Sequence, residues 1–395
     1  MSHTVSIRNL IAHAVGGGWG YGAPKASTEL VVVIRGADFP AIAVGDGSLV
    51  PVRWEERKKL PTRLLVPGDI VLEISGGTSD RPTGRTVFVS ERLLESIGKP
   101  TIPASFCRLV RVDQTKADPY YVYWWLQEMY AAGRTWAYQN RSTGIANFQF
   151  EHFLDAEMIY LPSIEEQRAI AATLGALDDK IESNRRAIDL AEQLADQLFA
   201  VKVADLIVLT DVAVLTMGSS PPGDTYNLDG VGLPFYQGVR DFGRRYPGHR
   251  VWTTGAVRLA YDNDSLVSVR APVGELNRSL ETCCIGRGVA AVSSEFPSCI
   301  YYALRASDAT WEPFQHEGTV FGAINKSDLS NARLPWPASD ALDALENQLS
   351  AIDDKIRSLS KEIEELTSLR DTLLPELLSG RIRFPEVQEA IEAAI

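Results

Sequence analysis

The stretch Ala-Leu-Asp-Asp-Lys-Ile at residues 176–181 recurs as Ala-Ile-Asp-Asp-Lys-Ile at residues 351–356, and this repeat decides the fold. Around both copies, apolar residues follow one another at alternating spacings of three and four, continuing to Leu194 and Leu369. This heptad pattern predicts one narrow apolar seam on each of two long helices, which is typical of a coiled coil. We expect the seam to contain Leu174, Leu177, Ile181, Asn184, Ile188, Leu349, Ile352, Ile356, Leu359 and Ile363.

Both helices have recognisable ends. Ser163 precedes Glu166 by three residues, which predicts a capping box at the start of the first helix. Ser339, after a proline, starts the second helix, and a Ser-Gly pair ends it. The predicted helices cover residues 163–204 and 338–380, or about 60 Å each at about 1.5 Å per residue.

Asn184 is the polar member of the predicted seam and occupies the position of Leu359 in the second copy. A single polar seam residue can fix the register of a coiled coil at some cost in stability. The alternative is that Asn184 has no role in register and is a polar residue tolerated near a helix end.

The repeat extends upstream of both helices. Residues 147–153 have a counterpart in residues 323–329, each running into a proline before a helix. Residues 68–75 resemble residues 263–270, and both are alternating strands that follow an acidic turn. The two halves of the chain are therefore expected to share one plan and to differ in loop length.

These observations predict the fold class and the domains. We expect an α/β (α+β) protein with a pseudo-twofold internal repeat, in which two mixed domains are separated by two long helices that form an antiparallel coiled coil. The predicted segments are a first domain at 1–162, a helix at 163–204, a second domain at 205–337, a helix at 338–380 and a C-terminal tail at 381–395.

The charge balance limits the ways in which this chain can bind polyanions. Its 39 Lys and Arg residues stand against 51 Asp and Glu residues, giving a formal charge of −12. We expect weak nucleic-acid binding by the chain alone, with contacts local or shared with a partner. The candidate basic clusters are Arg53, Arg57, Lys58, Lys59 and Arg63 in the first domain, and Arg240, Arg244, Arg245, His249 and Arg250 in the second.

Motifs of enzyme chemistry are incomplete. The glycines of residues 16–22 are not followed by the Lys-Ser/Thr of a phosphate loop, so a flexible loop is the better interpretation. Asp118-Pro119 superficially resembles part of a methyltransferase loop but lacks its second proline, and it predicts a helix start instead. Asp178 and Asp353 precede Asp-Lys pairs in the helices, where we expect solvated charged faces beside the seam.

Cysteine and histidine spacing favours neither a metal centre nor a disulfide framework. The four cysteines contain no C-x-x-C pair, and the five histidines are scattered. With no apolar stretch of membrane-spanning length and no signal-like N-terminus, the sequence predicts a cytoplasmic protein without a cofactor.

The run Leu-Pro-Ser-Ile-Glu-Glu-Gln-Arg-Ala-Ile at residues 161–170, followed by Leu-Asp-Asp-Lys-Ile, resembles the central region of specificity (S) subunits of type I restriction-modification systems. The run Leu-Leu-Pro-Glu-Leu-Leu-Ser-Gly at residues 373–380 resembles their distal region. In the distal copy the Glu-Gln element is replaced by residues 338–342, which makes that helix start less well marked. The resemblance covers the whole chain in organisation.

The resemblance implies a non-catalytic subunit that recognises double-stranded DNA. It implies two target recognition domains, each reading one half of an asymmetric split site, and helices that set the spacer. It further implies two modification (methyltransferase) subunits as partners, with restriction (motor and nuclease) subunits in the full complex. Adenine-N6 methylation and ATP-dependent DNA cleavage would belong to those partners.

Base and phosphate contacts are expected from polar residues of the domain loops, because arginine can pair with guanine and asparagine or glutamine with adenine in the major groove. The candidates are Arg53, Lys58, Lys59, Ser75, Thr78, Arg81, Arg85, Arg141, Asn147, Tyr236, Gln237, Arg240, Arg244, Arg270, Asn277, Arg278 and Lys326. Each could equally make a loop hydrogen bond. Two other classes of function stay open: a coiled-coil scaffold without sequence reading, and a stand-alone DNA-modifying enzyme.

Overall fold

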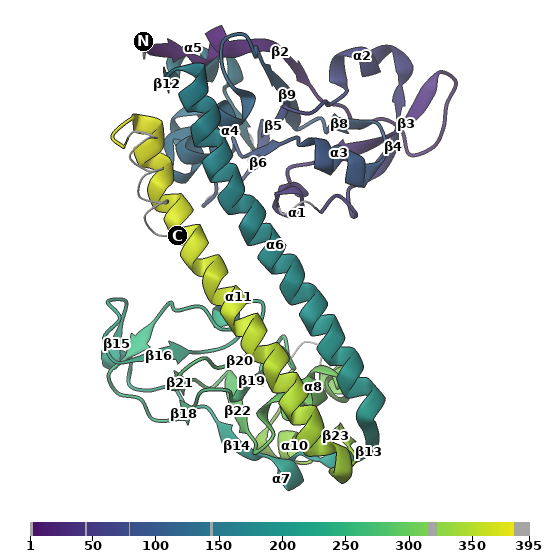
Figure 1. The fold of residues 1–395 in the computed structure, drawn as a ribbon, viewed down its shortest axis with the longest axis vertical. Helices are drawn as coiled ribbons and strands as arrows, with labels where there is room; N and C mark the ends of the chain where they lie inside the picture. Colours follow the sequence, from purple (N-terminus) through teal and green to yellow (C-terminus); the bar gives the residue numbers. More distant parts are fainter. Residues whose placement is uncertain (1–2, 44–45, 79, 143–144, 315–321, 383–395) are drawn as a thin grey trace. The chain divides into compact units, whose positions relative to one another are not determined.

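The described chain forms two compact units, Met1–Asn184 with Glu362–Ile395, and Arg185–Lys361. Each unit contains one mixed domain and part of both long helices, α6 (Ile164–Lys202) and α11 (Ser339–Ser379) (Figure 1). The computed structural model describes residues 3–43, 46–78, 80–142, 145–314 and 322–382.

The first domain is built on small, mostly antiparallel sheets joined by short helices. Its sheets, in strand order, are β1 (His3–Ser6) with β12 (Met158–Leu161); β2 (Ile11–Gly16), β9 (Cys107–Val112), β5 (Ile70–Glu73) and β7 (Thr86–Phe88); β4 (Val52–Glu56), β3 (Thr28–Ile34) and β8 (Thr101–Pro103); and β10 (Gln139–Ser142), β11 (Ile145–Phe148) and β6 (Ser75–Gly77). Its helices are α1 (Phe39–Ile42), α2 (Leu60–Arg63), α3 (Glu91–Ile97), α4 (Pro119–Ala131) and α5 (Phe150–Ala156).

The second domain repeats this plan. Its sheets are β13 (Val203–Val208) with β23 (Arg333–Pro337); β14 (Val214–Met217), β22 (Val289–Ser293), β19 (Ser265–Ser268) and β20 (Leu276–Arg278); and β15 (Tyr226–Asn227), β17 (Trp252–Thr253), β16 (Leu233–Tyr236), β21 (Cys283–Ile285) and β18 (Leu259–Ala260). Its helices are α7 (Leu209–Val212), α8 (Pro297–Arg305), α9 (Asp308–Trp311) and α10 (Lys326–Ser330).

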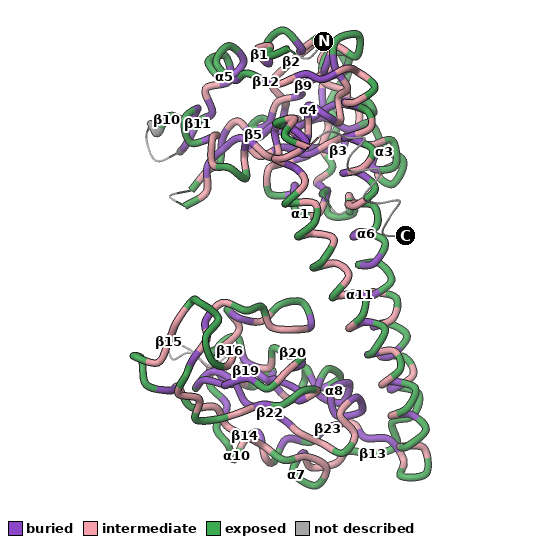
Figure 2. The backbone as a smooth tube through the Cα atoms, turned by 60° about the vertical axis from the view of Figure 1, so that its left-hand side comes forward, coloured by how far each residue is buried: buried purple, intermediate pink, exposed green. Residues whose placement is uncertain are grey.

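The internal repeat is visible in the strand order. Each domain has a four-stranded antiparallel sheet with its most buried strand in an inner position, β5 in the first and β19 in the second. Each also has one parallel strand pair, β3 with β8 and β16 with β21. All four residues of β5 and of β19 are buried, and buried residues gather in these inner strands (Figure 2). The predicted mixed α/β repeat is confirmed.

The start of α6 is fixed by the predicted capping box. The Ser163 backbone N–H donates to Glu166 Oε2 at 3.1 Å, and the Glu166 N–H donates to Ser163 Oγ at 3.3 Å. Gln167 is buried, and its Oε1 accepts the Asp118 N–H at 3.0 Å. Asp118 in turn caps α4, as the sequence predicts. The Leu-Pro-x-x-x-Glu-Gln run therefore joins two helix starts.

Within the first unit, α4 packs against α6 at very short range. A Cβ atom on Gly175 would lie 2.7 Å from a ring carbon of Tyr120, so only glycine permits this approach. α11 ends at Gly380, which has φ +71°, and a Cβ there would lie 3.2 Å from the ring of Tyr160. Tyr160 belongs to β12 and pairs with Thr4 of β1.

The two long helices are antiparallel, as predicted. In the first unit the beginning of α6 meets the end of α11, where Arg370 Nη1 donates to Asp178 Oδ1 at 2.7 Å. In the second unit Phe199, near the end of α6, shares an apolar core with Leu345 and Leu349, near the start of α11. Seven of the predicted seam residues are buried and Leu177, Ile352 and Ile363 are partly exposed. Leu194 and Leu369 depart from the pattern, being 49% and 46% exposed.

The prediction of a solvated face around Asp353 is wrong. Its side chain is buried and forms ion pairs with Arg245 and Arg278 of the second domain. Its neighbours Asp354 and Lys355 are exposed, as predicted. Asp178, at the equivalent position of the first helix, is partly exposed and pairs with Arg370. The second domain contacts this helix face, and so the aspartate is removed from solvent.

Candidate nucleic-acid interface

Several strands of the second domain end at one edge. β16 and β21 run parallel, with Tyr236 beside Ile285, and the N–H of Ile285 donates to the carbonyl of Arg258 at 3.0 Å. The N–H of Val269, just after β19, donates to the carbonyl of Gly288 at 3.0 Å. These contacts gather the residues that follow or flank the strands, which we call the second edge: Gln237, Arg240, Arg258, Arg270 and Arg287.

All five side chains of the second edge are exposed. Four of them are arginines, and none of these guanidinium groups makes a hydrogen bond or ion pair with a described residue of the chain. Because arginine is always charged and presents a rigid fork of donors, an unpaired group of this kind is suited to phosphate and to guanine. The second edge is therefore a local basic surface on an acidic chain.

Hydrogen bonds, an ion pair and a close glycine contact stabilise the turns that carry this edge. The Gln237 N–H donates to Asp241 Oδ2 at 2.6 Å, and Arg250 forms an ion pair with Asp241 at 2.7 Å. A Cβ on Gly288 would lie 2.3 Å from the carbonyl oxygen of Gln237, so the two turns touch only because this residue is glycine. Arg287 lies between Gly286 and Gly288 in the turn that joins β21 to β22.

The first domain has an edge at the same place in its strand order, which we call the first edge: Arg35, Thr78, Phe106 and Asn147. β3 and β8 run parallel, with Ile34 beside Pro103, and the N–H of Ile74 donates to the carbonyl of Phe106 at 2.9 Å. Asn147 is exposed on β11, opposite Ser75.

The chemistry of the first edge differs from that of the second. Arg35 is bound by both carboxylate oxygens of Asp38, at 2.7 and 3.0 Å. Arg85 Nη2 and Nε donate to the two oxygens of Glu73 at 2.6 and 2.9 Å. The exposed groups are then an amide, a hydroxyl and the Phe106 ring, which is 64% exposed. Two domains with one plan thus present unlike surfaces.

The predicted DNA-contacting residues fall into four groups. On the two edges and exposed are Thr78, Asn147, Gln237, Arg240 and Arg270, and Lys326 is exposed at the start of α10. Buried or bonded within the protein are Ser75, Arg81, Arg85, Tyr236, Arg244, Asn277 and Arg278. On or beside β4 are Arg53, Lys58 and Lys59. The side chain of Arg141 lies outside what the structure describes.

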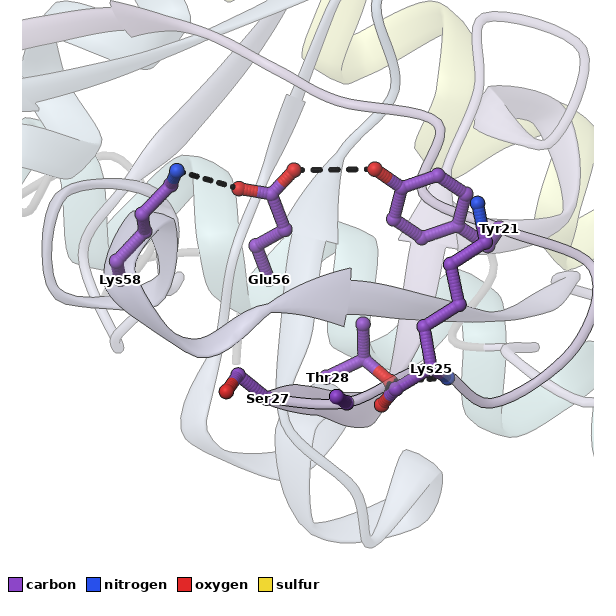
Figure 3. A pocket seen from close by; sticks show the side chains of 7 residues that line it. Tyr21, Lys25, Ser27, Thr28, Glu56 and Lys58 are labelled. Carbon is purple, nitrogen blue, oxygen red and sulfur yellow. Dashed lines mark hydrogen bonds and ion pairs between the residues drawn. The ribbon is translucent and has the colours of Figure 1, made fainter.

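The basic cluster beside β4 is partly neutralised. Figure 3 shows a pocket in which Glu56 accepts from Lys58 and from the Tyr21 hydroxyl, each at 3.1 Å. Hydrogen bonds from Lys59, Lys58 and Tyr21 lower the pKa of Glu56 to about 2, so this carboxylate stays charged. Lys25 lies over the Tyr21 ring, 3.7 Å from its centre. The pocket offers polar contacts with little excess charge.

Sequence reasoning missed Phe106, Arg258 and Arg287. Arg258 lies in a strand-poor stretch without any motif, and no pattern could have placed it beside β21. The Gly-Arg-Gly sequence around Arg287 was the available signal, because glycines on both sides of a cation are typical of an exposed loop tip.

The cysteines and the possible metal ligands are predicted to form no reactive centre. All four cysteines are buried free thiols, and burial raises the pKa of Cys107 and of Cys283 to about 12, which disfavours the reactive thiolate. The described part of the chain contains no cluster of His, Cys, Asp and Glu that could hold a metal ion. Among the described helices, none has the length and apolar character needed to span a bilayer.

Comparison with known proteins gives two informative similarities, while no family model matches the chain. A protein of Methanocaldococcus jannaschii, described as the type I restriction enzyme MjaX specificity subunit, is 31% identical over 309 residues. The match covers 70% of this chain and 71% of that protein. The crystal structure of a type I restriction-modification system S subunit from M. genitalium has the same fold, with a TM-score of 0.63, 16% identity and 96% coverage of both chains. The 31% identity to the M. jannaschii protein, together with the internal repeat and the antiparallel helices, shows that the chain belongs to the specificity subunits of type I restriction-modification systems.

Proposed function

We propose that each domain of this specificity subunit reads one part of a two-part DNA site through its edge of strand ends. The observation that carries this proposal is the pair of corresponding edges on two domains of one plan. Because the second edge has four exposed arginines without an ion pair to a described residue, and the first has an amide, a hydroxyl and an aromatic ring, the two half-sites are unlike. The whole site is therefore asymmetric.

The second edge provides the larger share of affinity. Its arginines neutralise phosphates and pair with guanine, while Gln237 pairs with adenine. In the first domain, Asn147 pairs with adenine and Phe106 contacts a thymine methyl or a base step. Since the formal charge of the chain is −12, partner subunits complete the surface around the duplex.

The long helices hold the two domains at a defined spacing and dock two modification subunits. α6 carries an exposed apolar stripe made by Leu190, Leu194 and Val201, which are 66%, 49% and 78% exposed. These residues share one helix face, because their spacings of four and seven correspond to whole turns. An exposed stripe on an otherwise charged helix is typical of a binding surface. Methylation and cleavage belong to the partner subunits.

Substitution at the second edge tests the reading of DNA. Arg270→Ala and Arg287→Ala should each lower affinity of the reconstituted complex for its site by about 5- to 150-fold, the effect of losing a base contact of about 1–3 kcal/mol. Genome-wide methylation mapping should show relaxed base preference in one half-site only. Arg333 is an exposed arginine on β23, so Arg333→Ala is the matched control. It should change neither the affinity for DNA nor the base preference. Unaltered affinity and motif in both edge variants would contradict the proposal.

Charge placed on the α6 stripe tests partner docking. The double change Leu190→Glu and Leu194→Glu should weaken assembly with the modification subunit by roughly tenfold or more, because apolar anchors at the centre of an interface carry most of its affinity. The isolated variant should stay folded, since both side chains are exposed. Gln193→Glu adds a charge to an exposed position next to the stripe and serves as control. Titration calorimetry measures the affinity of both variants for the modification subunit. If the double variant binds as tightly as the control, the stripe is not the docking surface.

A further inference from the structure

A buried charge cluster joins the second domain to α11. Asp353 of α11 is 6% exposed, and Arg245 and Arg278 of the domain are 2% and 3% exposed. The carboxylate forms ion pairs with both guanidinium groups and accepts hydrogen bonds from Ser298 Oγ at 2.6 Å and the Tyr302 hydroxyl at 2.8 Å. Burial raises the pKa of Tyr302, so its hydroxyl stays protonated and donates.

The cluster joins several segments of the second unit. Arg245 lies in the loop before β17, Arg278 ends β20, and the N–H of Arg278 donates to the carbonyl of Arg245 at 2.8 Å. Ser298 and Tyr302 belong to α8. Arg245 Nη1 also donates to Glu192 Oε1 of α6 at 3.4 Å. One aspartate therefore connects α11 to a loop, a strand end and a helix of the domain, and its partner Arg245 connects them to α6.

The apolar contacts of the same interface hold the domain but do not orient it sharply. Phe199, Leu345 and Leu349 pack in a shared core, and apolar attraction is proportional to area and has no direction. Hydrogen bonds to a charged group have preferred angles, and Arg245 and Arg278 donate to different oxygens of Asp353. Because a buried ion pair adds little net stability compared with apolar residues of similar size, a role in geometry accounts better for four polar partners on one carboxylate.

We propose that Asp353 is a positioning residue: with Arg245 and Arg278, it fixes the orientation of the second domain on its helix segments and so defines the spacing of the DNA site. This inference rests on the proposed function. Arg278 lies opposite Ser265 at the start of β19, whereas Arg270 of the second edge follows the end of that strand. The five residue steps from Ser265 to Arg270 span about 17 Å at about 3.3 Å each. A domain tilt of about 10° about the cluster would move the second edge by about 3 Å, close to the rise of one base pair, about 3.4 Å.

The test compares Asp353→Asn with Asp354→Asn in the complex reconstituted with its modification subunits. Asp354 is the adjacent, exposed aspartate of the same helix, so the control makes the same chemical change outside the cluster. Genome-wide methylation mapping reads the spacer distribution, which does not depend on how much of the protein is folded. Asp353→Asn should raise methylation of sites with a spacer one base pair longer or shorter by about fivefold or more, with both half-site sequences retained. Asp354→Asn should match the unsubstituted protein.

A triple variant separates positioning from folding. Arg245→Met, Arg278→Met and Asp353→Leu together remove the cluster and keep apolar volume, which preserves stability in comparable cores. We expect a folded complex with the same broadened spacing. A folded triple variant with spacing as narrow as the original would overturn the inference, whatever Asp353→Asn does. If the unsubstituted complex itself methylates no two-part sequence, the proposed function fails instead, and the two failures are distinguishable.

Discussion

Replacing residues 1–162 with the same domain of another specificity subunit should change one half of the methylated sequence completely and leave the other half and the spacer unchanged. The first domain has its own sheets and cores, and the second edge, Gln237 to Arg287, lies wholly in the other unit. If each domain reads its own half-site, as proposed, half of the site should follow the exchanged domain. Methylation mapping of the reconstituted chimaera measures this result.

The exchange succeeds only if the new domain fits the old helices. The first domain shares an apolar core with Ile170 and Leu174 of α6 and with Leu377 of α11, and its Asp118 N–H bonds to Gln167. The donor should therefore be selected for an aromatic ring at the position of Tyr120, which packs against Gly175. An exchange of residues 205–337 is the reciprocal control and should alter only the other half-site. A change in both half-sites, or in neither, would contradict modular reading.

Adding one heptad to each long helix should lengthen the spacer of the DNA site. The insertions belong after Asn184 in α6 and after Lys361 in α11, where the two units meet along the chain, so each domain keeps its own helix contacts. Seven residues preserve the seam and add about 10 Å at about 1.5 Å per residue. This length corresponds to about 3 base pairs at about 3.4 Å each.

The measurement is again genome-wide methylation by the reconstituted complex. Retained half-sites with a longer undefined spacer are expected. A companion variant with four residues inserted only in α6 displaces the seam and should lose activity, because apolar positions then face away from α11. An active heptad variant with unchanged spacing would show that the helices do not set the distance.

The long helices could be predicted to within two residues because their signals are local. Heptad spacing, the Ser163–Glu166 capping box and the terminal Ser-Gly lie within the segments that they define. The α4 start at Asp118 was equally readable. Strand pairing was predictable only in outline, since the partners of β5 and β19 lie far along the chain.

The burial of charges could not be predicted, because it depends on distant partners. Asp353 and Asp354 are adjacent and chemically identical, yet only Asp353 meets Arg245 and Arg278, which are 108 and 75 residues away. Arg244 and Arg245 differ in the same way, with exposed side-chain fractions of 47% and 2%. A run of basic residues in a sequence therefore gives the charge of a segment but not the part of it that solvent can reach.

The contact of Gly380 with Tyr160 has a topological consequence. Tyr160 is the strand partner of Thr4 on β1, and its ring lies beside Gly380, so the first strand and the last helical turn of the described chain adjoin the same residue. The first unit is therefore built from segments near both ends of the described chain, and its apolar core includes Leu374, Leu377 and Leu378 of α11. This core is complete only after α11 has been synthesised.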